Sequence, residues 1–377
     1  MRALFRRALF RLAACLAALV VLAALAPGGP AAAKVDLYRV QNLAVDESAP
    51  SAAEAKQAAM AAARLEAFDR VLRRLTLRED HERLPAPDPA VAAAAMRSVQ
   101  VLEERQSPVR YIARVSVGFH PEPVRTLLQK AGIPFSESVS GPVGVFPVYE
   151  WGSLRLLLED VNPWRAAWAL RPAVNEPVPL LLPLADDPAM LTPPMLTADS
   201  AADGDSARLL QAAARIGARR ALVAHAVYRL VGPRPVLEVA LRRFGAGAAA
   251  GAIQTLRIEG RPGETVESLC ARAAAAAADE IQESWKRANL VAAGTVAETF
   301  EATAALRDLA DLIAVKEVLA AAGGVQQVQL AELARDRALF RFRFAGGATR
   351  LQGVLERHGL ALEPAGANAW TLRSLDR

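Results

Sequence analysis

The stretch S-A-A-E-A-K-Q-A-A-M-A-A-A-R-L-E-A-F-D-R-V-L-R-R-L at residues 51–75 predicts a long amphipathic helix. Ser51 can cap its amino end, and Glu54, three residues later, can complete a capping box. Apolar residues recur at steps of three and four, which places them on one face of a helix. The predicted buried stripe contains Ala58, Ala62, Leu65, Phe68, Leu72 and Leu75.

This helix is flanked by segments with the character of strands. Residues 35–45 precede it, and two further runs at 98–105 and 109–119 follow a proline-rich break. A short helix is expected at 123–131, where Gly132 and Pro134 end it. This order of elements, strand, helix, strand, strand and helix, predicts a small antiparallel or mixed sheet with helices on one face.

The rest of the chain repeats this mixture of helices and strands, so we predict a multi-domain α+β fold. The loop at 185–205 is polar and proline-marked, and most of it is expected to lack secondary structure. The last region has the strand, helix, strand, strand, helix, strand order of a ferredoxin-like fold. The predicted regions are a leader (1–33), an N-terminal α+β domain (34–140), a middle α/β domain (141–292) and a C-terminal ferredoxin-like domain (293–377).

The first 33 residues have the layout of a cleavable secretory signal. Four arginines precede an apolar run at residues 12–26, and Pro27 to Pro30 then breaks the helix. Three alanines supply the small side chains that signal peptidase needs, so cleavage is expected between Ala33 and Lys34. Cys15 stands at the start of the apolar run rather than at its end, which argues against lipid attachment. The alternative is an uncleaved anchor.

Charge and length limit the partners of the exported chain. Four of the 45 Lys and Arg residues lie in the leader, together with none of the 40 Asp and Glu residues, so the remainder is close to neutral. A nucleic-acid partner is therefore not expected, because phosphates need a basic surface. No later segment approaches the ~20 apolar residues of a membrane span, so no permanent membrane anchor is expected.

Few residues suggest catalytic or metal chemistry. Cys270 is the only cysteine after the leader, so no internal disulfide is expected, and its apolar helical neighbours favour a buried packing role. The four histidines lie in separate segments without metal-ligand spacing, and we expect neither a metal nor a cofactor. The strand R-A-L-F-R-F-R-F-A-G-G at 337–347 resembles an RNA-binding strand, but Phe340, Phe342 and Phe344 alternate as core residues should.

The stretch D-V-N-P-W-R-A-A-W at 160–168 is the strongest candidate for a binding face. Asn162 can cap a helix that begins with a proline, and Trp164 and Trp168 then stand four residues apart on one face. One interpretation is a stacking platform for a sugar, a peptide or a partner, with Arg165 beside it. The other is that both rings pack in the core, as aromatic residues at helical spacing usually do.

Several stretches resemble a known family. R-Y-I-A-R-V-S-V-G-F at 110–119, V-R-T-L-L-Q-K-A-G-I-P-F at 124–135, N-P-W-R-A-A-W at 162–168 and G-A-R-R-A-L-V-A at 217–224 are similar to the proteobacterial family known as domain of unknown function 2066. This resemblance implies an envelope protein with no assigned activity. At the level of fold, the middle region is also similar to the amino-terminal domain of TolB and to modules of curli-secretion lipoproteins, which are interaction domains.

These observations together predict a periplasmic protein, exported by the general secretory route. The leading expectation is a non-catalytic interaction or assembly module of the cell envelope with an envelope protein as partner. One alternative is a protein that binds a small ligand or glycan at Trp164, Arg165 and Trp168. The other is a hydrolase whose catalytic residues are distant in the sequence.

Overall fold

The computed structural model describes most of the chain between residues 35 and 375. The described ranges are 35–159, 161–172, 175–184, 196–245, 253–291, 297–322, 324–356, 358–366 and 369–375. The predicted leader and its cleavage site between Ala33 and Lys34 lie outside them. In these ranges, no helix has both the length and the apolar character needed to cross a membrane.

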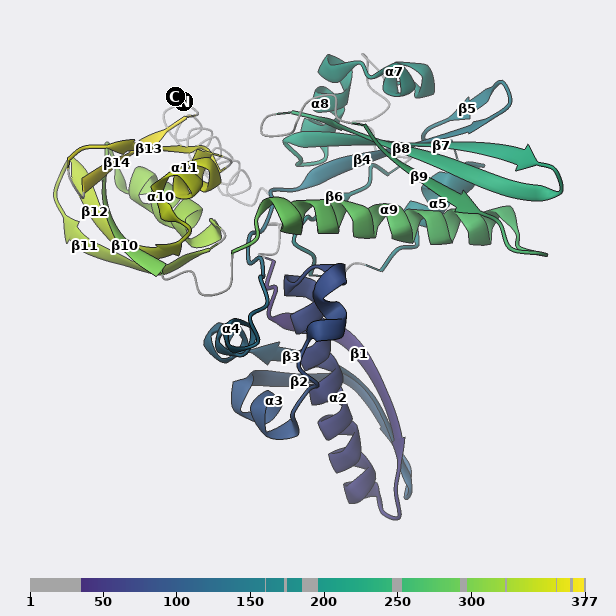
Figure 1. The fold of residues 1–377 in the computed structure, drawn as a ribbon, viewed down its shortest axis with the longest axis horizontal. Coiled ribbons are helices and arrows are strands. Elements are labelled where there is room, and N and C mark those ends of the chain that lie inside the picture. The colour runs from purple at the N-terminus through teal and green to yellow at the C-terminus, as the bar shows by residue number, and fades with distance from the viewer. Residues whose placement is uncertain are drawn as a thin grey trace, which may run out of the picture. The chain divides into compact units, whose positions relative to one another are not determined.

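The chain has an α+β fold built on three small sheets, which confirms the predicted class (Figure 1). The strands are β1 (Arg39–Ser48), β2 (Met96–Gln106), β3 (Arg110–Phe119), β4 (Val143–Trp151), β5 (Leu154–Leu156), β6 (Leu180–Leu181), β7 (Arg220–Val231), β8 (Arg234–Phe244), β9 (Ile253–Glu259), β10 (Ala297–Ala305), β11 (Val325–Leu333), β12 (Arg337–Ala345), β13 (Leu360–Pro364) and β14 (Ala369–Ser374). The helices are α2 (Ala52–Leu75), α3 (Pro89–Ala95), α4 (Pro121–Lys130), α5 (Pro163–Ala169), α7 (Ala198–Asp203), α8 (Ser206–Arg215), α9 (Val266–Ala288), α10 (Leu309–Ala321) and α11 (Gly347–Glu356), with a 3-10 helix at Arg78–Arg83.

The first sheet is antiparallel with the strand order β1-β3-β2, and α2 packs against β1 and β3. Ser51 caps α2 as predicted, because its hydroxyl oxygen accepts a hydrogen bond from the Glu54 backbone N–H at 3.2 Å. Another helix, α3, begins where only a proline-rich break was expected. The Asp88 carboxylate caps it by accepting from the N–H groups of Ala90 and Val91.

The buried face of α2 differs from the predicted stripe in its first half. Ala58 and Ala62 are exposed and Leu65 is half-buried, so the prediction was wrong for these residues. The sheet instead contacts a row of alanines that lies on the neighbouring face. The buried residues of α2 are Ala55, Ala59, Ala63, Ala67, Phe68, Val71, Leu72 and Leu75. Alanine occupies both faces of this half of the helix, so hydrophobicity alone does not fix which face packs.

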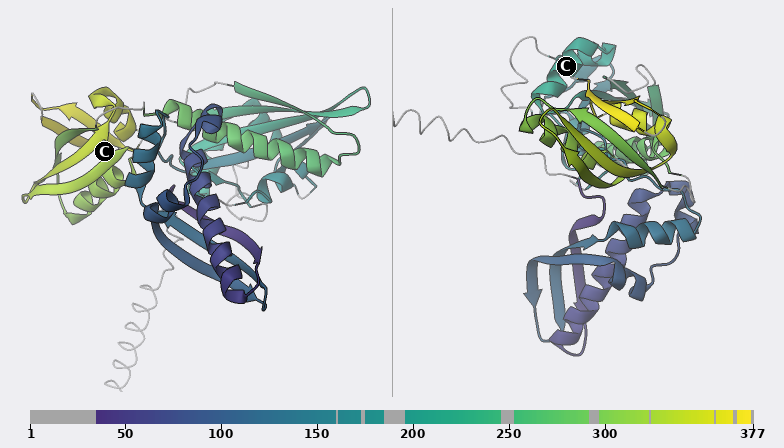
Figure 2. Two further views of the ribbon diagram at one scale, coloured as in Figure 1. Left: turned by 60° about the horizontal axis from the view of Figure 1, so that its bottom comes forward. Right: turned by 90° about the vertical axis from the view of Figure 1, so that its left-hand side faces the viewer.

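The second sheet follows the path β5-β4-β7-β8-β9, with β6 beside β4. Helices α9 and α5 pack on one face and α8 with α7 on the other, so this sheet is covered on both sides (Figures 1 and 2). Cys270, on the sheet-facing side of α9, is fully buried, as predicted. Asp205 caps α8, and α7 lies within the range expected to lack secondary structure because Thr197 and Ser200 form a capping box there.

The third sheet has the order β11-β12-β10-β14-β13. The expected strand, helix, strand, strand, helix, strand sequence runs from β10 to β13. A further strand, β14, then inserts between β10 and β13 and runs parallel to β10, so the sheet has one strand more than the predicted ferredoxin-like pattern. Phe340, Phe342 and Phe344 form the core with residues of α10 and α11, as predicted.

Candidate functional site

Helix α5 positions the predicted binding residues. The Asn162 carboxamide oxygen accepts hydrogen bonds from the N–H groups of Trp164 and Arg165, each at 3.0 Å, and fixes the start of the helix. Four residues of helix then place Trp168 beside Trp164, with ring centroids 5.7 Å apart and planes at 85°. This edge-to-face arrangement is a favourable one for an aromatic pair.

Both indole rings are buried, and this corrects their interpretation as a stacking platform. Trp164 is 0% exposed and Trp168 is 5% exposed. The Trp164 indole N–H donates to the Ala224 carbonyl oxygen of β7 at 2.8 Å, so the ring is held against the middle sheet. Arg165 is half-buried beside them. A stacking platform needs an exposed ring face, and packing against α9 leaves none. Both tryptophans therefore belong to the core of the second sheet.

The described residues contain no group of three or more His, Cys, Asp or Glu side chains that could hold a metal ion. His225 Nε2 lies 3.1 Å from a Glu150 carboxylate oxygen, and the same carboxylate accepts from Arg155 at 2.8 Å. Among the described residues, Glu150 is the side chain that hydrogen-bonds the His225 ring, and no serine or cysteine side chain does so. A histidine serves as the base for a nucleophile only within hydrogen-bond reach of it.

Cys270 is predicted to be unreactive in the folded protein. Burial raises the pKa of its thiol to about 12, helped by the nearby Glu267 carboxylate, and the thiolate is the reactive form. Maleimide labelling of the native chain should therefore be at least about 100-fold slower than labelling in denaturant. Equal rates in the two conditions would show that the thiol is accessible and would contradict the burial.

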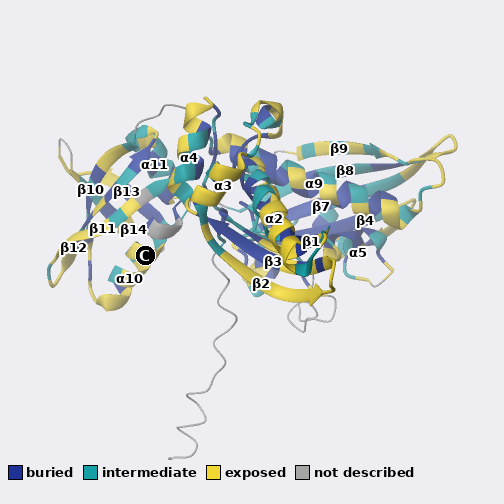
Figure 3. Cartoon of the chain, turned by 90° about the horizontal axis from the view of Figure 1, so that it is seen from below, coloured by how far each residue is buried: buried dark blue, intermediate teal, exposed yellow. Residues whose placement is uncertain are grey.

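Strand β2 is an exposed edge strand of the first sheet. It pairs with β3 on one side, and none of the described strands pairs with its other side. Every residue from Val99 to Gln106 is exposed, so the strand appears uniformly open along this length (Figure 3). Its outer edge therefore presents backbone N–H and C=O groups to water. Unpaired strand edges of this kind are sites where another strand can add.

The core-facing side chains of β2 are apolar but uncovered. Val99 lies opposite Val117 of β3 and Val101 lies opposite Val115, so all four point to the face that α2 covers. The two β3 valines are fully buried, whereas Val99 and Val101 are 42% and 40% exposed. Leu102, at a bulge in the strand, is 43% exposed. The apolar layer thus continues from the core to the edge without a helix over its last row.

The other edge strand of this sheet, β1, differs. Its core-facing residues Val40, Leu43 and Val45 are buried beneath α2. The Arg74 guanidinium also donates to the carbonyl oxygens of Leu37 and Arg39, which satisfies groups at the start of this strand. Strand β2 is therefore the edge of this sheet that combines free backbone groups with uncovered apolar side chains.

A polar group marks where the apolar part of β2 ends. The Tyr111 hydroxyl donates to a Glu104 oxygen at 2.7 Å, and the Lys56 ammonium of α2 donates to the same oxygen at 3.1 Å. Both hydrogen bonds lower the pKa of Glu104, so this carboxylate is ionised at neutral pH. The segment from Val99 to Leu102 is therefore the apolar half of the edge, and Glu103 to Gln106 is the polar half.

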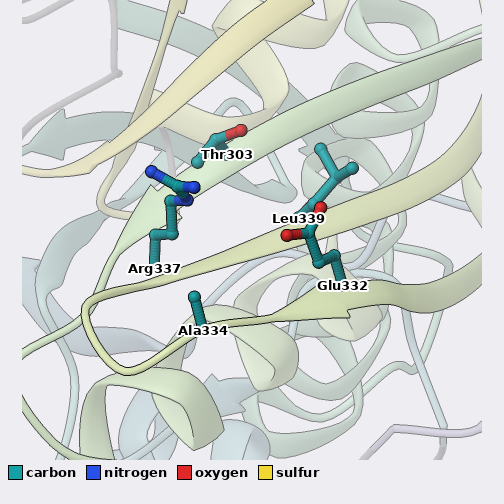
Figure 4. A pocket seen from close by; sticks show the side chains of 5 residues that line it. All are labelled: Thr303, Glu332, Ala334, Arg337 and Leu339. Atoms are coloured by element: carbon teal, nitrogen blue, oxygen red, sulfur yellow. The ribbon is translucent and has the colours of Figure 1, made fainter.

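A small cavity near the β11–β12 turn is too small to be a candidate ligand site. Thr303, Glu332, Ala334, Arg337 and Leu339 line it, and the Arg337 and Glu332 side chains extend from the two strands that the turn joins (Figure 4). Its volume is about 60 Å³. Pockets for small organic ligands are usually about 300 Å³ or larger, so this space suits a few water molecules.

Two comparisons test the resemblance to a known family. No protein-family model matches the chain, and no curated protein matches it. The resemblance to the domain of unknown function 2066 family therefore stays a prediction that rests on the quoted residues.

Sequence reasoning missed the open half of β2, although it predicted a strand there. The signal was present in Val99 and Val101, which alternate with Gln100. Alternation shows that a face is apolar, but it cannot show whether a helix covers that face. Only the position of α2 over β1 and β3 reveals that this row is left open.

Proposed function

We propose that this protein is an exported, non-catalytic interaction module of the cell envelope, which binds an extended segment of a protein partner along β2. The observation that carries the proposal is the free edge of β2, where uncovered valines continue the buried layer of the sheet. An extended peptide that adds to a sheet edge gains main-chain hydrogen bonds, and pockets for alternate side chains give specificity.

The chemistry of the edge defines the partner segment. Its backbone must be extended, and apolar side chains at alternate positions would cover Val99 and Val101. Each of these valines has about 40% of its surface still in water, so covering it contributes on the order of 1 kcal/mol. The backbone hydrogen bonds contribute a similar amount each. These gains must exceed the cost of association, about 4–15 kcal/mol, so we expect weak and reversible binding.

The cellular location in this proposal rests on the sequence. The arginine-rich start, the apolar run at 12–26 and the alanines before Lys34 favour export and cleavage. The resemblance to an envelope family points the same way. Binding of a glycan at Trp164 and Trp168 is not proposed, because both rings are buried.

The proposal predicts a protein adduct from β2 in living cells. A photo-crosslinking amino acid at Val101 should capture a specific protein after irradiation, whereas the same amino acid at Ala58, on the exposed side of α2, should not. Val101→Lys should abolish the adduct formed by a crosslinker at Leu102, because it places a charge in the apolar layer that the partner's side chains would cover.

Gln100→Lys is the matched control for this variant. It adds the same charge to the same strand but on the opposite face, so most of the Leu102 adduct should remain. Equal loss in both variants, or adducts of equal yield from Val101 and Ala58, would contradict an edge-specific interaction. Normal export and unchanged thermal unfolding of each variant show that the chain is folded.

A further inference from the structure

One end of the middle sheet carries a second group of exposed apolar side chains. The β4–β5 turn holds Trp151 and Leu154, which are 60% and 48% exposed. The β7–β8 turn holds Leu230 and Val231, which are 66% and 52% exposed. We name these four residues the hairpin end. It lies on a different sheet from β2 and is independent of the interaction proposed there.

Strand register places the hairpin end on adjoining strands. Trp151 lies directly opposite Leu154 on one side and opposite Tyr228 on the other. The rings of Trp151 and Tyr228 meet edge to face, with centroids 6.2 Å apart. Leu230, two residues beyond Tyr228, points to the same face of the sheet. Trp151, Leu154 and Leu230 therefore lie on one face of the sheet, while Val231, the next residue, points to the other face at the tip of the turn.

The hairpin end is the continuation of a core layer beyond its covering helix. Tyr228 packs partly against the core under α9, and Leu237, opposite it on β8, is fully buried. Further toward β5 the same row contains Trp151 and Leu154, which are exposed. Gly152 and Gly232 adopt positive φ angles of 62° in the two turns, and the space around their α-carbons is open.

Arginine is in excess near the hairpin end. The turn residues 151–154 and 231–234 include Arg234 and no acidic residue. The acidic neighbours have separate arginine partners: Glu238 pairs with Arg229 at 3.4 Å, Glu259 with Arg257 at 3.6 Å and Glu264 with Arg272 at 2.7 Å. Glu150, next to Trp151, pairs with Arg155 at 2.8 Å.

Within the described ranges, Arg234 and Arg261 form no ion pair, and both are exposed. Glu267, in the first turn of α9, also forms none there, so among these unpaired charges two are positive and one is negative. An anionic surface complements this balance.

We propose that the hairpin end docks on the headgroup layer of an anionic phospholipid membrane. Tryptophan and tyrosine prefer this layer because one end of each ring system is apolar and the other is polar. Leucine and valine at the turns can enter the acyl boundary, while Arg234 and Arg261 contact the phosphates. Unlike β2, the hairpin end offers side chains at turns rather than a row of free backbone groups, which favours a lipid surface over a peptide strand.

Vesicle sedimentation tests this proposal. The chain from Lys34 to Arg377 contains every described residue. It lacks the apolar leader, which would bind lipid by itself. It should sediment with vesicles of phosphatidylcholine that contain phosphatidylglycerol, and more weakly with phosphatidylcholine alone or at high salt. Trp151→Ala combined with Leu230→Ala should lower the partition coefficient at least about 10-fold, and Arg234→Ala about 5-fold.

Leu170→Ala is the matched control, since Leu170 is 84% exposed at the end of α5 and lies outside the hairpin end. It should leave vesicle binding unchanged. Absence of binding to anionic vesicles, or equal loss in the control, overturns the proposal. A photo-crosslinker at Trp151 should capture lipid in cells, and capture of a specific protein in its place also overturns it. Failure here leaves the β2 adduct unaffected, so the two proposals are tested separately.

Discussion

Trp164→Ala is expected to lower the free energy of unfolding of the middle sheet by about 3–5 kcal/mol. The side chain is 0% exposed and its indole N–H donates to the Ala224 carbonyl oxygen. Removing the ring leaves a cavity beneath α9 and removes the hydrogen bond to the Ala224 carbonyl oxygen, and both losses destabilise the fold. Denaturant unfolding followed by far-ultraviolet circular dichroism measures the loss, because that signal does not depend on tryptophan emission.

Trp151→Ala is the control for this prediction. Trp151 is the same residue type in the same sheet but is 60% exposed, so its replacement should cost about 1 kcal/mol or less. If the two variants were equally stable, the burial of Trp164 would be wrong and an exposed binding platform at α5 would return as an interpretation. The same pair of variants should rank in the opposite order in vesicle binding, where only Trp151 is expected to matter.

The strands were the most predictable part of this fold. Phe340, Phe342 and Phe344 alternate with arginines, and a half-buried sheet requires that pattern because successive side chains point to opposite faces. Helix starts were also predictable where a polar cap precedes a proline or an acidic residue. Asn162 and Ser51 form the expected capping hydrogen bonds.

The remaining features depend on contacts that sequence patterns do not encode. Alanine-rich helices have weak phase information, so Ala58 was assigned to the wrong side of α2. The insertion of β14 beside β10 is a choice of strand order rather than of local structure. The same limit applies to candidate binding residues. The sequence does not show which tryptophan is exposed, and only the packing of the fold shows that Trp164 is buried and Trp151 is exposed.

The two candidate surfaces share a physical origin. In both sheets an apolar layer extends past the helix that covers it, at Val99 and Val101 in one and at Trp151 in the other. Exposed apolar residues that continue a core layer are costly to solvate, and such patches often mark binding sites in folded proteins. Their different chemistry, backbone groups at β2 and turn side chains with arginine at the hairpin end, is the reason for assigning different partners.

Glu283→Gln is expected to lower the free energy of unfolding by about 3 kcal/mol or more. Glu283 and Lys286 on α9 form an ion pair at 2.5 Å, and their side chains are only 10% and 5% exposed. The Lys286 ammonium also donates to the Thr76 carbonyl oxygen, just after α2, and Glu283 accepts from the Arg78 backbone N–H. Removal of the carboxylate charge leaves a buried ammonium without its countercharge, which is the costly way to break such a pair.

A double-variant cycle separates this charge effect from packing. Lys286→Met added to Glu283→Gln should recover part of the loss, because the unpaired charge is then gone. Asp69→Asn is the matched control: Asp69 pairs with Arg73 on α2 at 2.6 Å, but both side chains are partly in water, so the loss should stay below about 1 kcal/mol. Strictly additive losses in the double variant would mean that the two groups do not interact. A large loss in Asp69→Asn would mean that burial does not determine how much an ion pair contributes to the free energy of unfolding. The cycle therefore tests whether charge burial, rather than the number of ion pairs, holds the end of α2 to α9.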